Sequence, residues 1–297
     1  MSPFSRRHLI ALVSMVVWAG CLPPAQDLFT RSEAALRASE FARAESLFSV
    51  YLTREPADAD AWYGRALAHA GRVDLSGARR DLDSAIRRAP WDRDARWMRF
   101  RIREQQIAAM RADTGASYYE SPLRAPLASA LTVIQIEELT SMLAIDPRDA
   151  AARCERAVLY RNGGRHAEAL ADLQYVLRED PSNIQALTER GNVYHALGRY
   201  ADAVKEYDAA LAECDTCRWL LYDKALSLHA GGLFDEAVSV LDRLVVVDRD
   251  DGDAWFLLGE CHMALHHPRA ACAAWEKSLD LGIAEAQARL DTSCRKR

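Results

Sequence analysis

A period of 34 residues is the feature of this sequence that most restricts its fold. Pro56 and Pro90 are 34 residues apart, and so are Pro147 and Pro181. The interval between Pro90 and Pro147 is 57 residues, which is one period plus 23 extra residues. A fixed period of this length indicates a supersecondary unit that is repeated and stacked.

Three positions within the period carry side chains of fixed size. In six units the eighth position is small, the twentieth is Ala, and the twenty-fourth is large and apolar. In chain order these residues are Ser32, Ala66, Ala157, Gly191, Ala225 and Gly259; Ala44, Ala78, Ala169, Ala203, Ala237 and Ala271; and Phe48, Leu82, Leu173, Tyr207, Leu241 and Trp275. Small residues on facing helices, with one bulky residue a turn further on, predict antiparallel helix pairs that close tightly and stack. Pro at the end of each unit predicts that the second helix stops there, because Pro has no N–H to continue it.

The segments ALTERGNVYHALGRYADAVKEYDAALAECD (186–215) and AWYGRALAHAGRVDLSGARRDLDSAIRRAP (61–90) carry this pattern most fully. It resembles the tetratricopeptide repeat (TPR) family, from about Gln26 to Gly282. The resemblance implies an all-α, right-handed superhelical solenoid of helix hairpins with about seven repeats. After Ile283 an amphipathic stretch, with Ala286 and Leu290 inward, predicts a helix that caps the exposed end of the stack.

The resulting organisation has six parts. They are a signal peptide (1–20), a short tether (21–25), repeats one and two (26–92), a divergent third repeat with an insertion (93–149), repeats four to seven (150–282), and a capping helix with a tail (283–297). The third repeat has Phe100 at the small position and Gln135 where Ala is expected. Its extra residues, which include Tyr118 and Tyr119, form either a lid over the binding groove or two lengthened helices; the composition favours the second.

The first twenty residues read as an export signal. Basic residues precede an apolar run from Leu9 to Trp18, and the small pair Ala19 and Gly20 stands directly before Cys21. The run is shorter than the roughly 20 residues that span a bilayer as a helix. AGC resembles a bacterial lipobox, although Trp18 stands where such boxes usually carry Leu, Val or Ile. The resemblance implies lipidation of Cys21 and attachment to the cell envelope, and Leu22 after the Cys favours the outer membrane, facing the periplasm. An ordinary leader or an uncleaved anchor is the alternative.

Charge and composition exclude several partners. The formal net charge is -5, and only four of the 38 basic residues are Lys, so nothing resembles a phosphate-binding strip and nucleic acid is not an expected partner. No Gly-rich phosphate loop, zincin motif or Ser elbow is present, so we expect no cofactor and no small-molecule substrate.

TPR geometry implies that the first helices line a concave groove. The fifth repeat position, which points into it, is aromatic in five of seven units: Phe29, Tyr63, Trp97, Cys154, Thr188, Tyr222 and Phe256. Trp219, Asn192, His195, His229 and Glu260 add to the groove. This mixture of rigid apolar anchors and polar groups is suited to a peptide or a helix; alternatively, several of the aromatic residues pack within their own hairpins. Of the carboxylate clamp found in chaperone-binding TPRs only Asn192 is present, with Thr188 in place of its Lys.

Cysteine and histidine offer two further hypotheses. His262 and His266 are four residues apart beside Cys261, the spacing of a helical metal site, but the repeat frame accounts for both His residues and we predict no metal there. Without Cys21 six Cys remain. Cys214 and Cys217 form a possible disulfide at a junction that lacks Pro, and Cys261 and Cys272, on opposing helices of one hairpin, form a second possible pair.

The sequence therefore predicts a non-enzymatic scaffold or adaptor of the bacterial cell envelope, bound to the membrane by its lipid and to a protein partner by its groove. Two alternatives remain. One is a metal- or thiol-dependent enzyme that uses the His and Cys cluster of the last repeat, and the other is a cytoplasmic TPR regulatory scaffold whose leader is misread.

Overall fold

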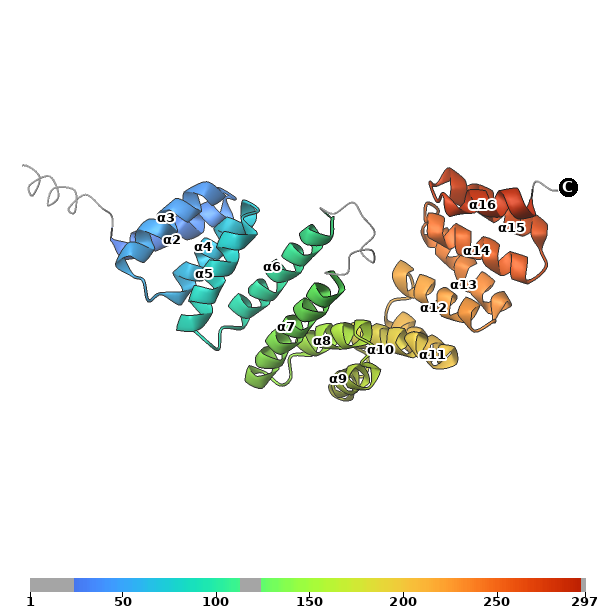
Figure 1. Ribbon diagram of the computed structural model, residues 1–297, viewed down its shortest axis with the longest axis horizontal. Coiled ribbons are helices and arrows are strands. Elements are labelled where there is room, and N and C mark those ends of the chain that lie inside the picture. The colour runs from blue at the N-terminus through green and yellow to red at the C-terminus, as the bar shows by residue number, and fades with distance from the viewer. Residues whose placement is uncertain (1–23, 113–123, 295–297) are drawn as a thin grey trace, which may run out of the picture. The chain divides into compact units, whose positions relative to one another are not determined.

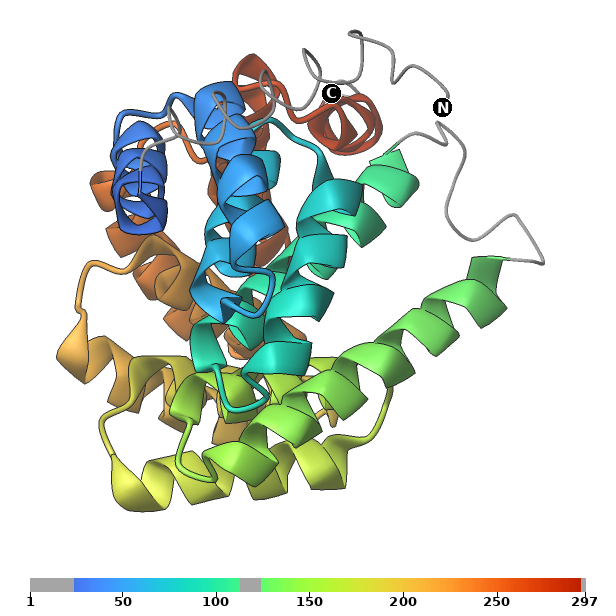
Figure 2. The same ribbon diagram turned by 90° about the vertical axis from the view of Figure 1, so that its left-hand side faces the viewer.

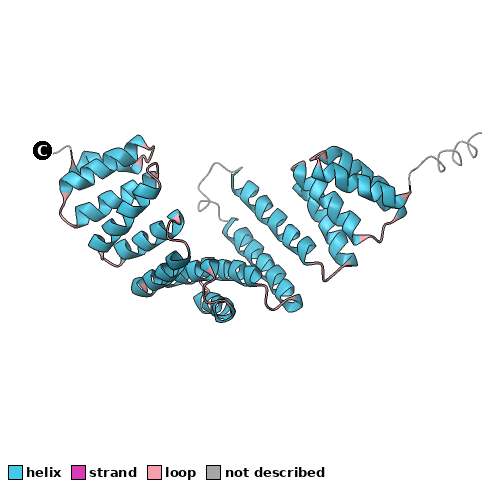
Figure 3. Cartoon of the chain, turned by 180° about the vertical axis from the view of Figure 1, so that it is seen from behind, coloured by secondary structure: helices cyan, strands magenta, loops and turns pink. Residues whose placement is uncertain are grey.

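A computed structural model describes residues 24–112 and 124–294, and every regular element in these ranges is an α-helix (Figures 1 and 3). The helices are α2 (Ala25–Arg37), α3 (Phe41–Arg54), α4 (Ala59–Gly71), α5 (Leu75–Arg88), α6 (Arg93–Ala112), α7 (Arg124–Ile145), α8 (Ala150–Asn162), α9 (His166–Glu179), α10 (Ile184–Ala196), α11 (Tyr200–Glu213), α12 (Arg218–Ala230), α13 (Phe234–Val247), α14 (Gly252–Ala264), α15 (Pro268–Asp280) and α16 (Glu285–Ser293). The predicted all-α fold class is confirmed.

Consecutive helices pack as hairpins, and within each compact unit a hairpin packs on the helix that follows it. The hairpins are α2/α3, α4/α5, α8/α9, α10/α11, α12/α13 and α14/α15, and α16 packs on α15. The first helices of neighbouring hairpins also touch, as α2 does with α4, α8 with α10, α10 with α12, and α12 with α14. Figure 2 shows α2 to α4, in blue, lying side by side. This is the predicted solenoid of stacked hairpins.

The chain divides into two compact units, residues 1–126 and 127–297. The boundary falls in the first turn of α7, inside the third repeat. The two helices of this repeat are unusually long. α6 has 20 residues and α7 has 22, whereas α4, the first helix of the preceding repeat, has 13. Tyr118 and Tyr119, proposed above as part of a lid, lie outside the described residues.

Size-matched side chains close each hairpin. All six residues at the twenty-fourth position have at most 1% of their surface exposed, and all six Ala at the twentieth position are fully buried. Gly191 lies against Tyr207, and a Cβ added to it would stand 2.6 Å from the tyrosine ring. Gly259 makes the same contact with Trp275. Tyr207 and Trp275 therefore pack against the Gly of their own hairpin, and Phe48 packs against Gly64 of the next repeat. The three Leu residues of this position share their hairpins with Ala at the eighth position.

Repeat junctions are held by a shared set of hydrogen bonds. Asp58, Asp149 and Asp251 each precede a first helix and accept a hydrogen bond from one of its backbone N–H groups, which satisfies donors that the helix itself leaves unpaired. At the fourth helical position, a side chain also donates to the carbonyl six residues back. These bonds are Trp62 Nε1 to Pro56, Arg96 Nε to Pro90, Arg153 Nε to Pro147 and Trp255 Nε1 to Arg249.

The junction before α12 is built differently. Cys217 occupies the cap position and makes no side-chain cap hydrogen bond. It is instead joined by a disulfide to Cys214, with 5.5 Å between the two Cα atoms. A covalent link stands where the other junctions have an Asp or Asn cap.

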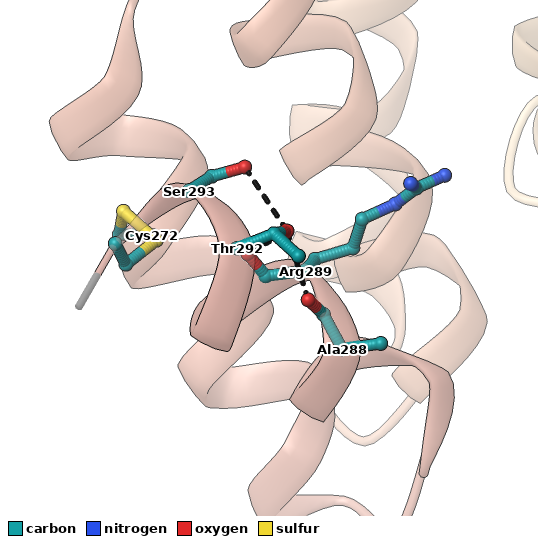
Figure 4. Close-up of a disulfide and its surroundings, with 6 residues drawn as sticks. Cys272, Ala288, Arg289, Thr292 and Ser293 are labelled. Carbon is teal, nitrogen blue, oxygen red and sulfur yellow. Dashed lines mark hydrogen bonds between the residues drawn. A yellow bond between two sulfur atoms is a disulfide. The ribbon is translucent and has the colours of Figure 1, made fainter. Parts of the chain in front are cut away.

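The C-terminal helix α16 covers the last hairpin. Ala286 and Leu290 are buried, as predicted. A disulfide joins Cys272 of α15 to Cys294, which directly follows α16, beside the hydrogen bonds of Thr292 to Ala288 and Arg289 (Figure 4).

The pairing of Cys261 with Cys272 is wrong. Cys261 is free and fully buried on α14, whereas Cys272 is only partly buried and packs in the cluster that includes α16. The repeat pattern places Cys261 and Cys272 on opposing helices. The residue that bonds to Cys272 is Cys294, which lies after the last repeat.

Residues 1–23, with the predicted leader and Cys21, lie outside the described residues. Within the described ranges, no helix combines the length and apolar character needed to cross a membrane.

Candidate functional site

The first helices of the second unit, α8, α10, α12 and α14, lie in consecutive contact. We call the surface that they form the first-helix face. It carries most of the predicted binding residues, and the first unit carries the others on α2, α4 and α6.

Aromatic side chains on α12 and α14 dominate one part of this face. Tyr222 and Phe256 are half-buried, each packed against a core cluster on one side. Trp219, in the first turn of α12, has 57% of its surface exposed. A large exposed indole beside two anchored rings is the composition found at protein-binding surfaces.

Several of the predicted polar groups are already used within the protein. Thr188 is buried and donates to the Ile184 carbonyl. His195 Nδ1 lies 2.7 Å from Ser227 Oγ on α12, and burial lowers the pKa of this imidazole, so it is neutral at pH 7. His195 joins α10 to α12, and Thr188 bonds within its own helix, so both side chains offer little to a partner.

Asn192 and Glu260 are also engaged. Asn192 accepts a hydrogen bond from the buried Tyr207 hydroxyl at 2.8 Å and donates to Glu189 at 3.3 Å. Glu260 accepts two hydrogen bonds from Arg289 of α16, at 2.8 and 3.0 Å. His229 stacks edge-on against Phe234 with 5.4 Å between ring centroids. The polar residues chosen from the sequence therefore mostly hold helices together.

Asp223 is a residue that sequence reasoning missed. Burial, followed by the neighbouring Glu189 carboxylate, raises its pKa to about 6, against the opposing effect of Arg161. No described residue donates a hydrogen bond to its carboxylate. Its position, next to Tyr222 and one turn from Trp219, follows from the helical period, so a scan of the sixth repeat position for acidic residues would have found it.

Carboxylates surround the Tyr222 hydroxyl. Burial is the main cause of its raised pKa, and Asp253, Asp251 and Asp223 add to it in that order. Asp253 is exposed on the first turn of α14, and no described residue pairs with it. Tyr222 is therefore a half-buried ring close to carboxylates of its own helix and of α14.

The first unit repeats this arrangement at Tyr63. Burial raises the pKa of Tyr63, and Asp94 and Asp92 of the following repeat raise it further. The other two predicted aromatic residues of this unit are half-buried and contact rings of their own hairpin or helix. Phe29 lies 5.9 Å from Phe48 and 5.3 Å from Tyr51 between ring centroids, and Trp97 lies edge-on to the buried Phe100 at 5.7 Å.

Buried ion pairs inside three hairpins were also missed. Arg65 pairs with Asp81 at 2.7 Å, Arg156 with Asp172 at 2.7 Å, and Arg190 with Glu206 at 2.7 Å. Each acidic residue follows its arginine by 16 residues and lies on the second helix. This recurring separation of opposite charges is the signal that could have identified them.

The last repeat holds the Cys261, His262 and His266 side chains of the alternative metal or thiol site. Burial raises the pKa of the Cys261 thiol to about 12, which keeps it protonated at neutral pH. His266 lies in the turn after α14 with a backbone φ of 60°. In the part of the chain that the structure describes, no group of three His, Cys, Asp or Glu side chains could hold a metal ion.

The comparison with known families agrees with this architecture. The tetratricopeptide repeat family matches residues 29–99, 136–184, 154–216 and 222–282. These stretches cover more than half of the sequence, and the chain belongs to the tetratricopeptide repeat family. Proteins of this family are in general non-enzymatic scaffolds for protein–protein interaction. No curated protein matches the sequence.

Solved structures show the same fold at low sequence identity. A tetratricopeptide repeat protein from Parabacteroides merdae is 14% identical with a TM-score of 0.62, over 90% of this chain and 97% of that one. The C-terminal part of a TPR repeat-containing protein from Cytophaga hutchinsonii is 14% identical with a TM-score of 0.65, over 88% and 99%. The Cut9–Hcn1 hetero-tetramer of APC/C provides a chain that is 12% identical with a TM-score of 0.58, over 89% of this chain and 48% of that one.

Proposed function

We propose that this TPR protein is a non-enzymatic adaptor of the bacterial cell envelope that binds a peptide or helix of a protein partner on its first-helix face. The observation that carries the proposal is the exposed Trp219 on the same helix as the half-buried Tyr222, with the half-buried Phe256 on the contacting helix α14. Rigid aromatic rings anchored on packed helices bind a partner at little entropic cost. The fold itself is one that serves as an interaction scaffold.

Site-specific photocrosslinking in living cells tests where the partner binds. A photoreactive residue replaces Trp219 on α12, and in a matched variant it replaces Val246 near the end of α13, which has 74% of its surface exposed. We expect Trp219 to crosslink a discrete protein and Val246 to crosslink none. Crosslinks from Val246 alone would contradict the proposed binding face. Thr188 is unsuitable as a crosslinking site, because its side chain is buried.

The envelope attachment is supported by the sequence alone. The basic start, the apolar run and the small pair before Cys21 fit a lipoprotein leader, and an acylated Cys would anchor the chain stably because several acyl chains enter the bilayer together. In the Cys21→Ala variant we expect the protein to leave the membrane fraction. An unchanged distribution between membrane and soluble fractions would contradict the proposed lipid anchor.

A further inference from the structure

We infer that the first-helix face binds a cationic, extended segment of the partner, with an Arg or Lys side chain placed over the Tyr222 ring. This inference rests on the proposed function and specifies the chemistry of the partner. It is carried by the charges and rings of α10, α12 and α14.

The cations of α10 and α12 are already paired, Arg190 with Glu206, Arg218 with Asp248 and Lys224 with Asp208. The charge left uncompensated on this part of the face is therefore negative. Glu189, Asp223 and Asp253 supply carboxylates from α10, α12 and α14, and Arg161 of α8 lies 3.4 Å from Glu189. Glu260 is already compensated by Arg289, and His195 is neutral because burial lowers its pKa. Asp223 and Asp253 have no cationic partner within hydrogen-bond distance among the described residues. The surface therefore complements positive charge and repels a terminal carboxylate.

The aromatic groups add a second preference for cations. A tyrosine or tryptophan ring attracts an ammonium or guanidinium group placed over its face, and the attraction is larger when the cation is partly desolvated. Tyr222 is half-buried and flanked by Asp223, Asp251 and Asp253, so one cation can meet the ring and a carboxylate together. Trp219 offers an exposed ring on the same helix.

The same combination occurs at Tyr63, which is flanked by Asp92 and Asp94. In both places a tyrosine at the fifth position of one repeat faces two aspartates, at the cap and second positions of the next repeat. Asp92 and Asp251 each use one oxygen to cap their helix. Because the arrangement occurs twice, we take the two aspartates to contribute negative charge to the surface, in addition to the helix cap that one of them forms.

Peptide binding to the purified chain tests the inference by fluorescence anisotropy. The probes are a labelled peptide in which Arg alternates with Ser, and the same peptide with Gln or Glu in place of Arg. We expect the Arg peptide to bind at least about tenfold more tightly than the Gln peptide, and added salt to weaken its binding. Equal binding of the three peptides, or preference for Gln or Glu, would overturn the inference.

Matched variants locate the binding. Asp253→Asn should weaken the Arg peptide about threefold, and Tyr222→Ala about tenfold, whereas Tyr222→Phe keeps the ring and should bind like the parent. Asp235→Asn changes the net charge equally, but it lies in the first turn of α13, a second helix, and should have no effect. If Asp235→Asn and Asp253→Asn weaken binding equally, the inference is wrong.

The two proposals can fail separately. If Trp219 crosslinks a partner selectively while the purified chain shows no preference for the Arg peptide, the scaffold function stands, and the inference that the partner segment is cationic is wrong. Crosslinks from Val246 alone would remove the binding face itself.

Discussion

The paired residues at the eighth and twenty-fourth positions of the repeat set how closely two helices approach. Gly259 faces the indole of Trp275, while Ala225 and Leu241 occupy the same two positions one repeat earlier. The Trp275 Nε1 atom is buried without a hydrogen-bond partner in the described structure. Sequence reasoning identified these positions correctly, because close packing of antiparallel helices restricts side-chain volume at fixed intervals.

Gly259→Ala is expected to destabilise the protein by about 2 kcal/mol, since the added methyl group overlaps the Trp275 ring in a filled core. Gly259→Ala combined with Trp275→Leu recreates the Ala and Leu pair of other repeats, and should cost less than the sum of the two single changes. Urea unfolding measures both effects. Gly163→Ala is the control, because a Cβ there meets only backbone oxygens, the nearest at 3.4 Å. If the double variant loses as much stability as the two single variants together, the size matching of these two positions is contradicted.

Asp223 gives the protein a measurable dependence on pH. Its pKa in the folded state is about 6, above the value of 3.8 for the free side chain, so the folded state binds the proton more tightly than the unfolded state. The carboxylate therefore costs stability above pH 6, and this cost disappears as the pH falls from about 6 towards about 4.

Asp223→Asn should consequently stabilise the protein at pH 7.5 by about 1 kcal/mol, after allowance for solvent screening. The difference between variant and parent should shrink at pH 4.5, where Asp223 is protonated. Thermal unfolding at the two pH values measures it. A variant that is equally stable relative to the parent at both pH values would show that Asp223 titrates normally.

The junctions are the elements in which this chain departs from its own period. Most junctions use an Asp or Asn cap, and four of them also use a side-chain bond to a carbonyl six residues back, whereas Cys217 replaces the cap before α12. At the other end, Cys294 fastens α16 to α15. The period could not predict this second pairing, because Cys294 lies outside the repeats and its position depends on how α16 packs.

Replacing Cys272 and Cys294 by Ser should release α16 from the last hairpin. The disulfide spans 22 residues, and the lost loop constraint corresponds to about 3 kcal/mol in the chain-entropy model. Hydrogen exchange should become faster in α15 and α16 and stay unchanged in α8 to α11, since neighbouring repeats are coupled mainly to one another. Replacing Cys214 and Cys217, which are three residues apart, should cost less, about 2 kcal/mol. Unchanged exchange in α16 after loss of the first pair would show that packing alone holds the helix.

For the whole molecule, the sequence predicted the fold well, but it did not predict which groove residues already have partners inside the protein. Helix pairing follows from a period that six of the seven repeats obey, so it could be predicted from the sequence. Which groove residues remain available to a partner could not be read in this way. Thr188, Asn192 and Glu260 occupy face positions, yet each is bound by a partner on its own helix, the second helix of its hairpin or the capping helix. The boundary between the two compact units, after Pro126, was also missed. The length of an insertion can be counted in the sequence, but its effect on packing cannot be predicted from that length.

The central claim is that stacked hairpins present their first helices to a protein partner. Hydrogen–deuterium exchange of the complete chain, alone and with the protein captured from Trp219, tests it most directly. The account predicts slower exchange in α12 and α14 on binding, with α11 and α13 unchanged. Protection confined to α11 and α13 would contradict it.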